Sequence, residues 1–179
     1  MMRVAMSGDQ ALIQIVDAAL AEAARKSGAW LVCRPGCTEC CMGPFPITQL
    51  DARRLREGLA ELESRDRQRA ARVRERARQA VAQPATDDDP CPALDPSTGT
   101  CDLYAARPIT CRIFGPPVRY GSDAVGICEL CFHGASDEEI AACQVEVDPG
   151  LEFQLSNEVE ESTGVSGETS VAFALVAAQ

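Results

Sequence analysis

Aromatic side chains, lysine and histidine are scarce in this 179-residue chain. Aromatics make up 4% of the residues, the only lysine is Lys26 and the only histidine is His133. Much of the 46% apolar fraction is alanine, which buries little area, so burial stabilises this chain less than a domain rich in leucine and phenylalanine. With one histidine and no serine in a nucleophile-elbow motif, the sequence offers no candidate catalytic residue.

Long apolar runs are also missing. No segment is apolar over enough residues to span a bilayer, and Asp9, Gln14 and Asp17 interrupt the N-terminal stretch where an export signal needs a continuous hydrophobic core. We therefore expect no membrane association and a cytoplasmic location. The net charge of −10 argues against general affinity for the phosphates of DNA or RNA, and hence against a nucleic-acid partner.

Cysteine, in contrast, is abundant, with ten in the chain. The first four read Cys33-Arg-Pro-Gly-Cys37-Thr-Glu-Cys40-Cys41, and two or three intervening residues let a loop direct two sulfurs at one ion. Adjacent side chains point in different directions in extended backbone. We therefore expect Cys40 and Cys41 to bind metal at two different sites, or one of them to pack instead of binding metal. A cytosolic setting keeps thiols reduced, which favours metal over a disulfide scaffold.

The other six cysteines lie in the second half of the chain. Three of them are too widely spaced for a local knuckle and must be brought back to the first group by the fold. These are Cys91, Cys101 and Cys111. Cys128-Glu-Leu-Cys131 has the spacing of metal ligands, and His133 follows as an exposed loop residue or a ligand. Cys143 is equally a small core residue or a ligand.

Apolar periodicity and capping signals predict a mostly α fold. Residues 7–28 form a helix with Ser7 as N-cap and Gly28 as its end. Thr48, with Asp51 as a capping-box variant, starts a helix to about residue 62, and 64–81 is helical as its continuation or as the second arm of a hairpin. Further helices are predicted from Ser136 through Cys143 and over 149–162, and 169–176 fits either a helix or a buried strand.

These segments predict a small helical domain packed around a loop-rich cysteine metal-binding centre. We expect a single domain over residues 1–179. Its metal-binding core spans 29–117, with a helical insertion at 48–82, and 118–179 adds a C-terminal cysteine pair and helices.

Arginine supplies almost all of the positive charge. Seven arginines recur between residues 65 and 78, with acidic residues at helical spacing from them, so we predict a solvated helical face rather than a nucleic-acid surface. The acidic partners expected are Glu61, Glu63, Asp66 and Glu75. Four thiolates around a divalent zinc ion leave a net charge of −2. Nearby arginines can offset this charge as hydrogen-bond donors outside the coordination sphere. The candidates are Arg34, Arg107 and Arg112.

Three ordered motifs carry a family resemblance. They are Cys37-x2-Cys40-Cys41, Cys91-Pro-Ala-Leu-Asp and Cys101-Asp-Leu-Tyr-Ala-Ala-Arg-Pro-Ile-Thr-Cys111-Arg-Ile-Phe-Gly. Over about residues 29–117 they resemble the CxxCxxCC family, also called the YkgJ family, a mostly bacterial zinc- or iron-chelating domain. The resemblance implies seven ligands: Cys33, Cys37, Cys40, Cys41, Cys91, Cys101 and Cys111. The chain departs from the family pattern at Cys33, which is three rather than two residues before Cys37, and at Thr38, where members often have glycine. Cys128 and Cys131 join the predicted ligands on spacing alone.

The metal itself is left open by the residues. All-thiolate sites accept zinc and iron–sulfur clusters alike, at one site or at two. We expect a mainly structural or binding module whose metal contributes folding free energy. The alternative is an iron–sulfur redox or protein-modifying enzyme, because the cysteine motif is similar to that of the flagellin lysine N-methylases. Those enzymes are longer, however, and no Gly-x-Gly-x-x-Gly follows a strand here. Neither a substrate nor a protein partner is readable.

Overall fold

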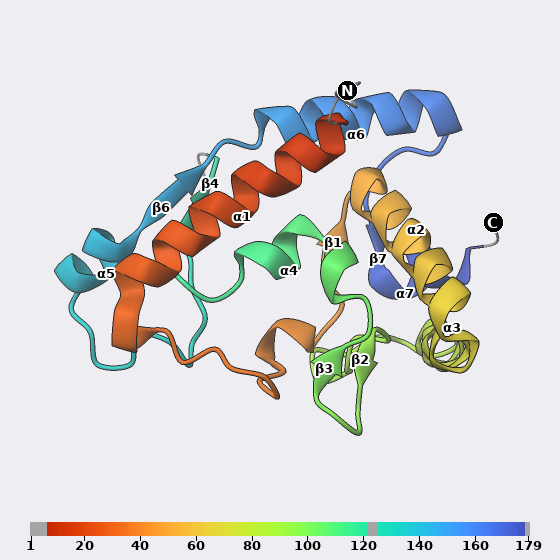
Figure 1. Ribbon diagram of the computed structural model, residues 1–179, viewed down its shortest axis with the longest axis horizontal. Helices are drawn as coiled ribbons and strands as arrows, with labels where there is room; N and C mark the ends of the chain where they lie inside the picture. The colour runs from red at the N-terminus through yellow and green to blue at the C-terminus, as the bar shows by residue number, and fades with distance from the viewer. Residues whose placement is uncertain (1–6, 122–124, 178–179) are drawn as a thin grey trace, which may run out of the picture. The chain divides into compact units, whose positions relative to one another are not determined.

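A computed structural model describes residues 7–121 and 125–177. Over these residues the fold is mostly α, as predicted, with short 3-10 turns and strands of two or three residues (Figure 1). The α-helices are α1 Gly8–Ser27, α2 Gln49–Arg65, α3 Arg67–Val81, α4 Ile109–Ile113, α5 Asp137–Cys143, α6 Gly150–Thr163 and α7 Val171–Val176. The 3-10 turns are η1 Gly28–Trp30, η2 Glu39–Cys41 and η3 Tyr104–Ala106. The strands are β1 Pro46–Ile47, β2 Leu94–Asp95, β3 Thr100–Cys101, β4 Val118–Tyr120, β5 Val125–Gly126, β6 Val145–Val147 and β7 Thr169–Ser170.

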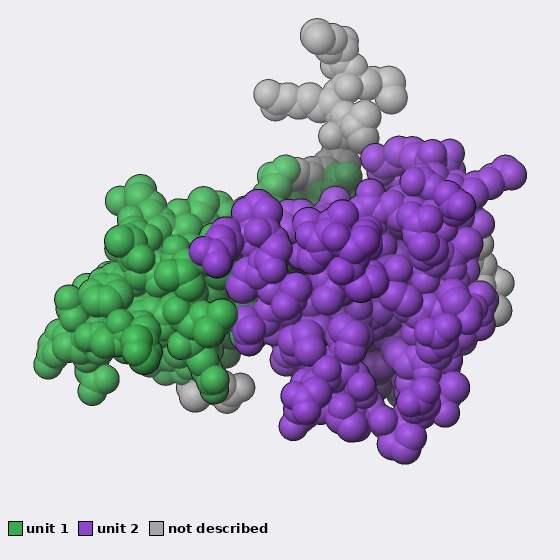
Figure 2. All heavy atoms as spheres, turned by 90° about the horizontal axis from the view of Figure 1, so that it is seen from below, with its two compact units in different colours: residues 1–33, 112–159 green, residues 34–111, 160–179 purple. Residues whose placement is uncertain are grey.

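The chain divides into two compact units (Figure 2). Unit 1 comprises residues 1–33 and 112–159, and unit 2 comprises residues 34–111 and 160–179. Four cysteines therefore belong to unit 1, namely Cys33, Cys128, Cys131 and Cys143, and the other six belong to unit 2. Because a compact unit need not fold on its own, the domain organisation expected from the sequence stays a prediction.

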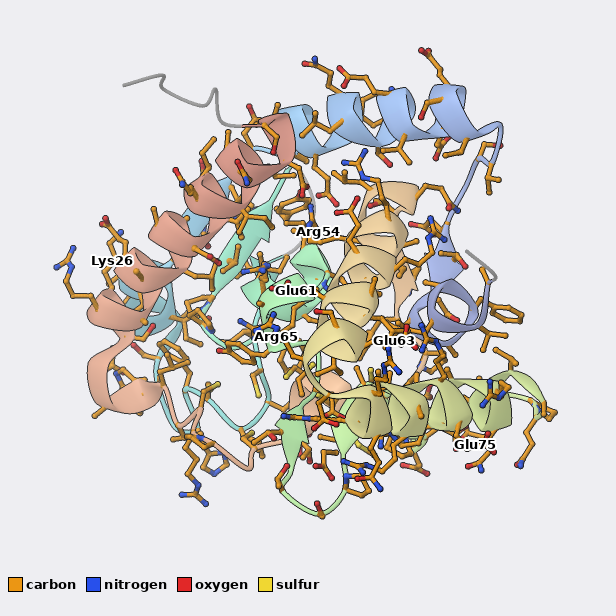
Figure 3. The ribbon with its side chains drawn as sticks, turned by 45° about the vertical axis from the view of Figure 1, so that its right-hand side comes forward. Lys26, Arg54, Glu61, Glu63, Arg65 and Glu75 are labelled. Carbon is orange, nitrogen blue, oxygen red and sulfur yellow. The ribbon has the colours of Figure 1, made fainter. Side chains whose placement is uncertain are left out.

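Unit 1 combines α1 with a small sheet. In that sheet β4 pairs antiparallel with β5 and parallel with β6, and α1 packs against β6 and α5 (Figure 1). Near the end of α1, the Lys26 ammonium (Figure 3) donates to the Gln144 carbonyl at 3.4 Å. The Cys143 thiol donates to the Lys26 carbonyl at 3.3 Å. These two bonds join the end of α1 to the end of α5.

Unit 2 is built on α2, α3 and α7, which pack against one another. Six of the thirteen buried residues in its core are alanine and none is aromatic, which agrees with the composition of the chain. Cys91 and Cys101 pack against this core. Gly58, in the middle of α2, admits Ala106 of η3 so closely that a methyl group at position 58 would collide with the Ala106 side chain. Glycine weakens a helix, but at position 58 it leaves the space into which η3 packs against α2.

Side-chain caps confirm three predicted helix starts. The hydroxyls of Ser7, Thr48 and Ser136 each accept a hydrogen bond from the backbone N–H three residues on, at 3.2–3.3 Å. The stretch 48–81 is two helices, because Asp66 leaves the helical conformation (φ −147°, ψ 87°) and its carboxylate then accepts from the Arg69 N–H at 2.9 Å. The first of these helices is three residues longer than predicted.

The apolar segment near the C-terminus is the helix of its two predicted alternatives, because α7 covers Val171–Val176 and only Thr169 and Ser170 before it form a strand. Thr169 and Ser170 pair with Ile47 and Pro46 in an antiparallel two-stranded sheet, and α7 follows directly. The Ser170 hydroxyl caps α7 by accepting from the Phe173 N–H at 3.4 Å. Within 7–121 and 125–177, no helix has the length and apolarity needed to cross a bilayer.

Candidate metal centre

The loop before α2 lies against the loop after α3. The Cys91 N–H donates to the Cys41 carbonyl at 2.7 Å, and Met42 and Pro90 form an isolated antiparallel bridge. Between Arg34 and Cys37 a turn is closed by a 2.9 Å hydrogen bond, in line with the predicted role of the intervening proline and glycine. Two cysteines far apart in sequence, Cys41 and Cys91, are thus held at one backbone junction.

A hairpin brings Cys101 to the same place. Leu94 of β2 faces Cys101 of β3, and the Asp102 N–H donates to the Ala93 carbonyl at 2.7 Å. The Leu94 N–H also donates to the Cys91 carbonyl at 2.9 Å, which closes a tight turn from Cys91 to Leu94. Cys101 is therefore held beside the turn that begins with Cys91.

A buried ion pair positions α4, the short helix that carries Cys111. The carboxylate oxygens of Asp51 accept from the Ile109 N–H, the first of α4, at 3.2 and 3.3 Å. Arg54 of α2 (Figure 3) donates to the same carboxylate, and Asp51 and Arg54 are 1% and 6% exposed. Burial is the main cause of the raised pKa of Cys111, and charge repulsion from Asp51 raises this pKa further. Asp51 therefore lies near the Cys111 sulfur. The sequence pointed to Asp51 only as a capping residue, and it gave no sign of the pair with Arg54.

Five thiols of unit 2 influence one another electrostatically, and we call them the five-thiol group. They are Cys40, Cys41, Cys91, Cys101 and Cys111. Cys41 donates a hydrogen bond to the Cys40 sulfur, which, helped by the Arg107 guanidinium, lowers the pKa of Cys40 to about 6. The same hydrogen bond, together with burial, raises the pKa of Cys41. The adjacent side chains therefore interact rather than diverging as they would in extended backbone, because the 3-10 turn η2 curls the chain at Glu39–Cys41.

Burial dominates at the other three thiols of the group. It raises the pKa of Cys91 to about 11 and that of Cys111 to about 12, and it raises the pKa of Cys101 as well. Backbone amides act in the opposite direction: those of Ala93 and Leu94 point at the Cys91 sulfur, as Leu103 does at Cys101. Amide hydrogen bonds to sulfur favour the thiolate, which is the form that binds metal.

One of the three predicted charge-balancing arginines belongs to this group. The positive charge of the Arg107 guanidinium helps to lower the pKa of Cys40 and partly offsets the effect of burial on the pKa of Cys101, so it stands near both sulfurs. It lies 3.6 Å over the ring of Tyr104, and its Nε donates to the Tyr104 carbonyl at 3.1 Å. Arg112 instead pairs with Asp17 in unit 1 at 2.8 Å, and Arg34 is exposed. Closeness to a cysteine in the sequence did not indicate which of the three arginines lies near these sulfurs.

Two arginines of α3 hold the residue after Cys101. Arg69 and Arg76 both form ion pairs with Asp102, whose side chain is 1% exposed. Arg76 also donates from Nε to the Pro92 carbonyl at 2.8 Å. The expected helical partners are present elsewhere, as in the pair of Arg74 with Glu63 and that of Arg78 with Glu75 (Figure 3). The arginine run is therefore partly a solvated face and partly a support for the cysteine hairpin.

We expect Arg76→Gln to lower the free energy of unfolding by about 1–3 kcal/mol, because it removes two hydrogen bonds, one to a buried carboxylate. The measurement is urea denaturation followed by circular dichroism. Arg72→Gln is the matched control, since it makes the same change at an exposed position of the same helix and should stay within about 0.5 kcal/mol of the parent. Equal effects of the two substitutions would refute the supporting role of Arg76.

The remaining predicted ligands are not part of the five-thiol group. Cys37 is half-buried in unit 2, and its sulfur is not among the five that interact. Cys33, Cys128 and Cys131 belong to unit 1. His133 is exposed, and Cys143 is buried. All ten cysteines lie in the described part of the chain, and no disulfide forms among them.

The donor set suits zinc or an iron–sulfur cluster, since both are held by thiolates with hydrogen bonds to sulfur. Nevertheless, among the described residues no three or more side chains of His, Cys, Asp or Glu stand in the geometry of a finished metal site. A closed coordination sphere therefore requires the thiols of the group to come closer together than they are here. The assignment of individual ligands stays a prediction.

Comparison with known proteins identifies the family. The model of the CxxCxxCC family, whose description is "Putative zinc- or iron-chelating domain", matches residues 32–133. The match covers more than half of the chain and includes nine cysteines, all except Cys143. No curated protein and no solved structure matches the chain. The chain therefore belongs to the CxxCxxCC family of zinc- or iron-chelating domains.

Proposed function

We propose that the five-thiol group of unit 2 binds zinc or an iron–sulfur cluster, and that the protein is a non-catalytic metal-binding module of the cytoplasm. The observation that carries this proposal is the convergence of sulfurs from four separate segments: η2, the Cys91 turn, β3 and α4. Backbone hydrogen bonds tie η2, the Cys91 turn and β3 to one another, and the buried Asp51 carboxylate accepts the N–H at the start of α4. Buried thiols that repel one another as thiolates stay protonated unless a cation compensates their charge, so the binding of a metal ion would release their protons.

The local chemistry favours metal over inert packing. Backbone amides aimed at the Cys91 and Cys101 sulfurs stabilise negative charge on them, and Arg107 adds a positive charge beside Cys40 and Cys101. Four thiolates complete a tetrahedral zinc or a cubane cluster, so five thiols supply one more than a single centre uses. When bound, the metal would draw the hairpin, η2 and α4 together.

An iron–sulfur redox or protein-modifying activity, akin to that of the flagellin lysine N-methylases, is the alternative hypothesis. Amide hydrogen bonds to sulfur tune the reduction potential of iron–sulfur clusters, so the contacts at Cys91 and Cys101 suit this role as well. The two hypotheses differ in the metal. Visible absorption with bound iron favours the alternative, whereas a colourless protein with bound zinc eliminates it.

The proposal predicts that Cys91→Ser combined with Cys111→Ser lowers the metal content of the five-thiol group, because the three thiols that remain cannot supply the four thiolates of a closed zinc or cubane site. Elemental analysis of the purified variant should find less zinc or iron per chain than in the parent. Cys143→Ser is the control, since Cys143 donates its proton to the Lys26 carbonyl in unit 1 and should keep the full metal content. An undiminished metal content in the double variant would overturn the proposal.

A further inference from the structure

The geometry points to a second metal site, formed within unit 1 by Cys33, Cys128 and Cys131, that binds its own ion. This inference rests on the proposed function, because it assumes that thiols of this protein bind metal. It assigns three of the four predicted ligands that the five-thiol group leaves out, all except Cys37, and it divides the first cysteine motif between two centres.

Gly115 brings Cys33 to the loop of the other two cysteines. The Cys33 sulfur lies so close to Gly115 that a Cβ at that position would be 3.2 Å from it. The Gly115 carbonyl accepts from the Cys128 N–H at 3.1 Å. One residue in the positive-φ region (φ +130°) therefore contacts both cysteine segments, and only glycine suits it.

The Cys128 loop repeats the turn at Cys91. In each turn the N–H three residues after the first cysteine donates to the cysteine carbonyl at 2.9 Å. In each, the amides two and three residues on also point at the cysteine sulfur, namely Ala93 and Leu94 at Cys91, and Leu130 and Cys131 at Cys128. The same thiolate-stabilising turn is thus built once in each unit, although the sequences share little beyond the cysteine.

The surroundings hold this loop in a defined shape. The Phe132 N–H donates to the Trp30 carbonyl at 3.2 Å, and the two rings stack with centroids 6.1 Å apart. Phe132 adopts φ 59°, the one positive φ at a described non-glycine residue, directly after Cys131. Such a conformation is strained for phenylalanine and persists only where neighbours enforce it. The strained position turns the chain immediately after the second sulfur.

These contacts define the chemistry of the site. Cys128 and Cys131 are buried in one apolar cluster, while Cys33 is exposed. Cys143 shares their apolar cluster, but its proton is donated to the Lys26 carbonyl. The three thiolates of the site, one of them on the exposed Cys33, leave the fourth position of a tetrahedral ion to a solvent ligand, as in zinc sites with three protein ligands.

Metal stoichiometry tests the inference. The full-length chain, depleted of metal and reconstituted with Co²⁺, should bind one fewer ion when Cys128→Ser and Cys131→Ser are combined, and it should retain the ion of the five-thiol group. The Cys91→Ser and Cys111→Ser pair should show the reverse loss, and Cys143→Ser should bind as the parent does. Cys33→Ser changes an exposed residue, so it should leave the fold intact while weakening the thiolate-to-cobalt absorption.

Each other result contradicts a specific claim. Unchanged Co²⁺ binding and absorption in the Cys128, Cys131 and Cys33 variants would overturn the second site and leave the proposed function standing. Loss of all metal from either double variant would show one shared centre, which also overturns the second site. Absence of metal binding in the parent chain would refute the proposed function itself.

Discussion

Removing the metal with a strong chelator is expected to unfold unit 2 cooperatively. Structural zinc contributes apparent binding free energies on the order of 10–16 kcal/mol in small thiolate sites, which exceeds the net stability of most domains. The core of unit 2 has six alanines among thirteen buried residues and no aromatic, and Cys91 and Cys101 pack directly on it. Without a metal ion, the buried thiols contribute no attraction that would offset the small apolar area buried in this core. Circular dichroism at 222 nm should therefore show loss of helix as metal leaves.

The control for this experiment is the same chelator saturated with zinc beforehand, which should leave the helical signal unchanged. Readdition of the metal under reducing conditions should restore it. If elemental analysis finds no residual metal while the spectrum and the thermal transition stay as they were, the metal has no structural role.

Asp51→Asn is expected to lower the free energy of unfolding by about 3–5 kcal/mol, the usual cost of removing one partner from a buried ion pair. The substitution keeps the shape of the side chain but removes the negative charge of Asp51 from beside the buried Arg54 guanidinium. It also weakens the acceptor that holds the Ile109 N–H at the start of α4. Because α4 carries Cys111, metal affinity should fall along with stability. Denaturant titration and metal content measure the two effects.

Asp66→Asn provides the matched control for that variant. Asp66 also accepts a backbone N–H, from Arg69 at 2.9 Å, but it does so at an exposed N-cap. Asparagine caps helices about as well as aspartate, so the change in stability should be no more than about 0.5 kcal/mol. Similar losses in the two variants would show that Asp51 acts only as a cap, contrary to the role assigned to it.

Local signals in the sequence were sufficient for the helix starts. The caps at Ser7, Thr48 and Ser136 depend on a hydroxyl and a backbone N–H three residues on, so they are encoded within one turn. The tight turn at Cys91 is local in the same way. Predictions of this kind succeed because both partners lie within a few residues of each other.

Features that depend on distant segments were not accessible. Asp102 was never paired with Arg69 or Arg76, because the hairpin that brings them together is set by the packing of α3. Gly58 weakens α2 when the helix is considered alone, and only the close approach of Ala106 accounts for it. A single sequence shows how many residues separate two side chains, whereas these contacts depend on which distant segments pack together in the fold.

The division of the cysteines illustrates the same limit. Cys33 and Cys37 read as one motif because three residues separate them, yet they belong to different compact units. Cys40 and Cys41 were expected to diverge, as neighbours do in extended backbone, but the 3-10 turn η2 places their sulfurs within hydrogen-bond reach. The sequence placed all five thiols of the group among nine predicted ligands, but it did not separate them from the other four.

Metal analysis of anaerobically purified protein, combined with its visible spectrum and a count of reactive thiols, is the most direct test. If buried thiols from remote segments bind a shared cation, the protein should carry stoichiometric zinc or iron, and those thiols should react with a thiol reagent only after chelation or denaturation. A folded protein that contains neither metal, and whose thiols react equally with and without chelator, would contradict the account.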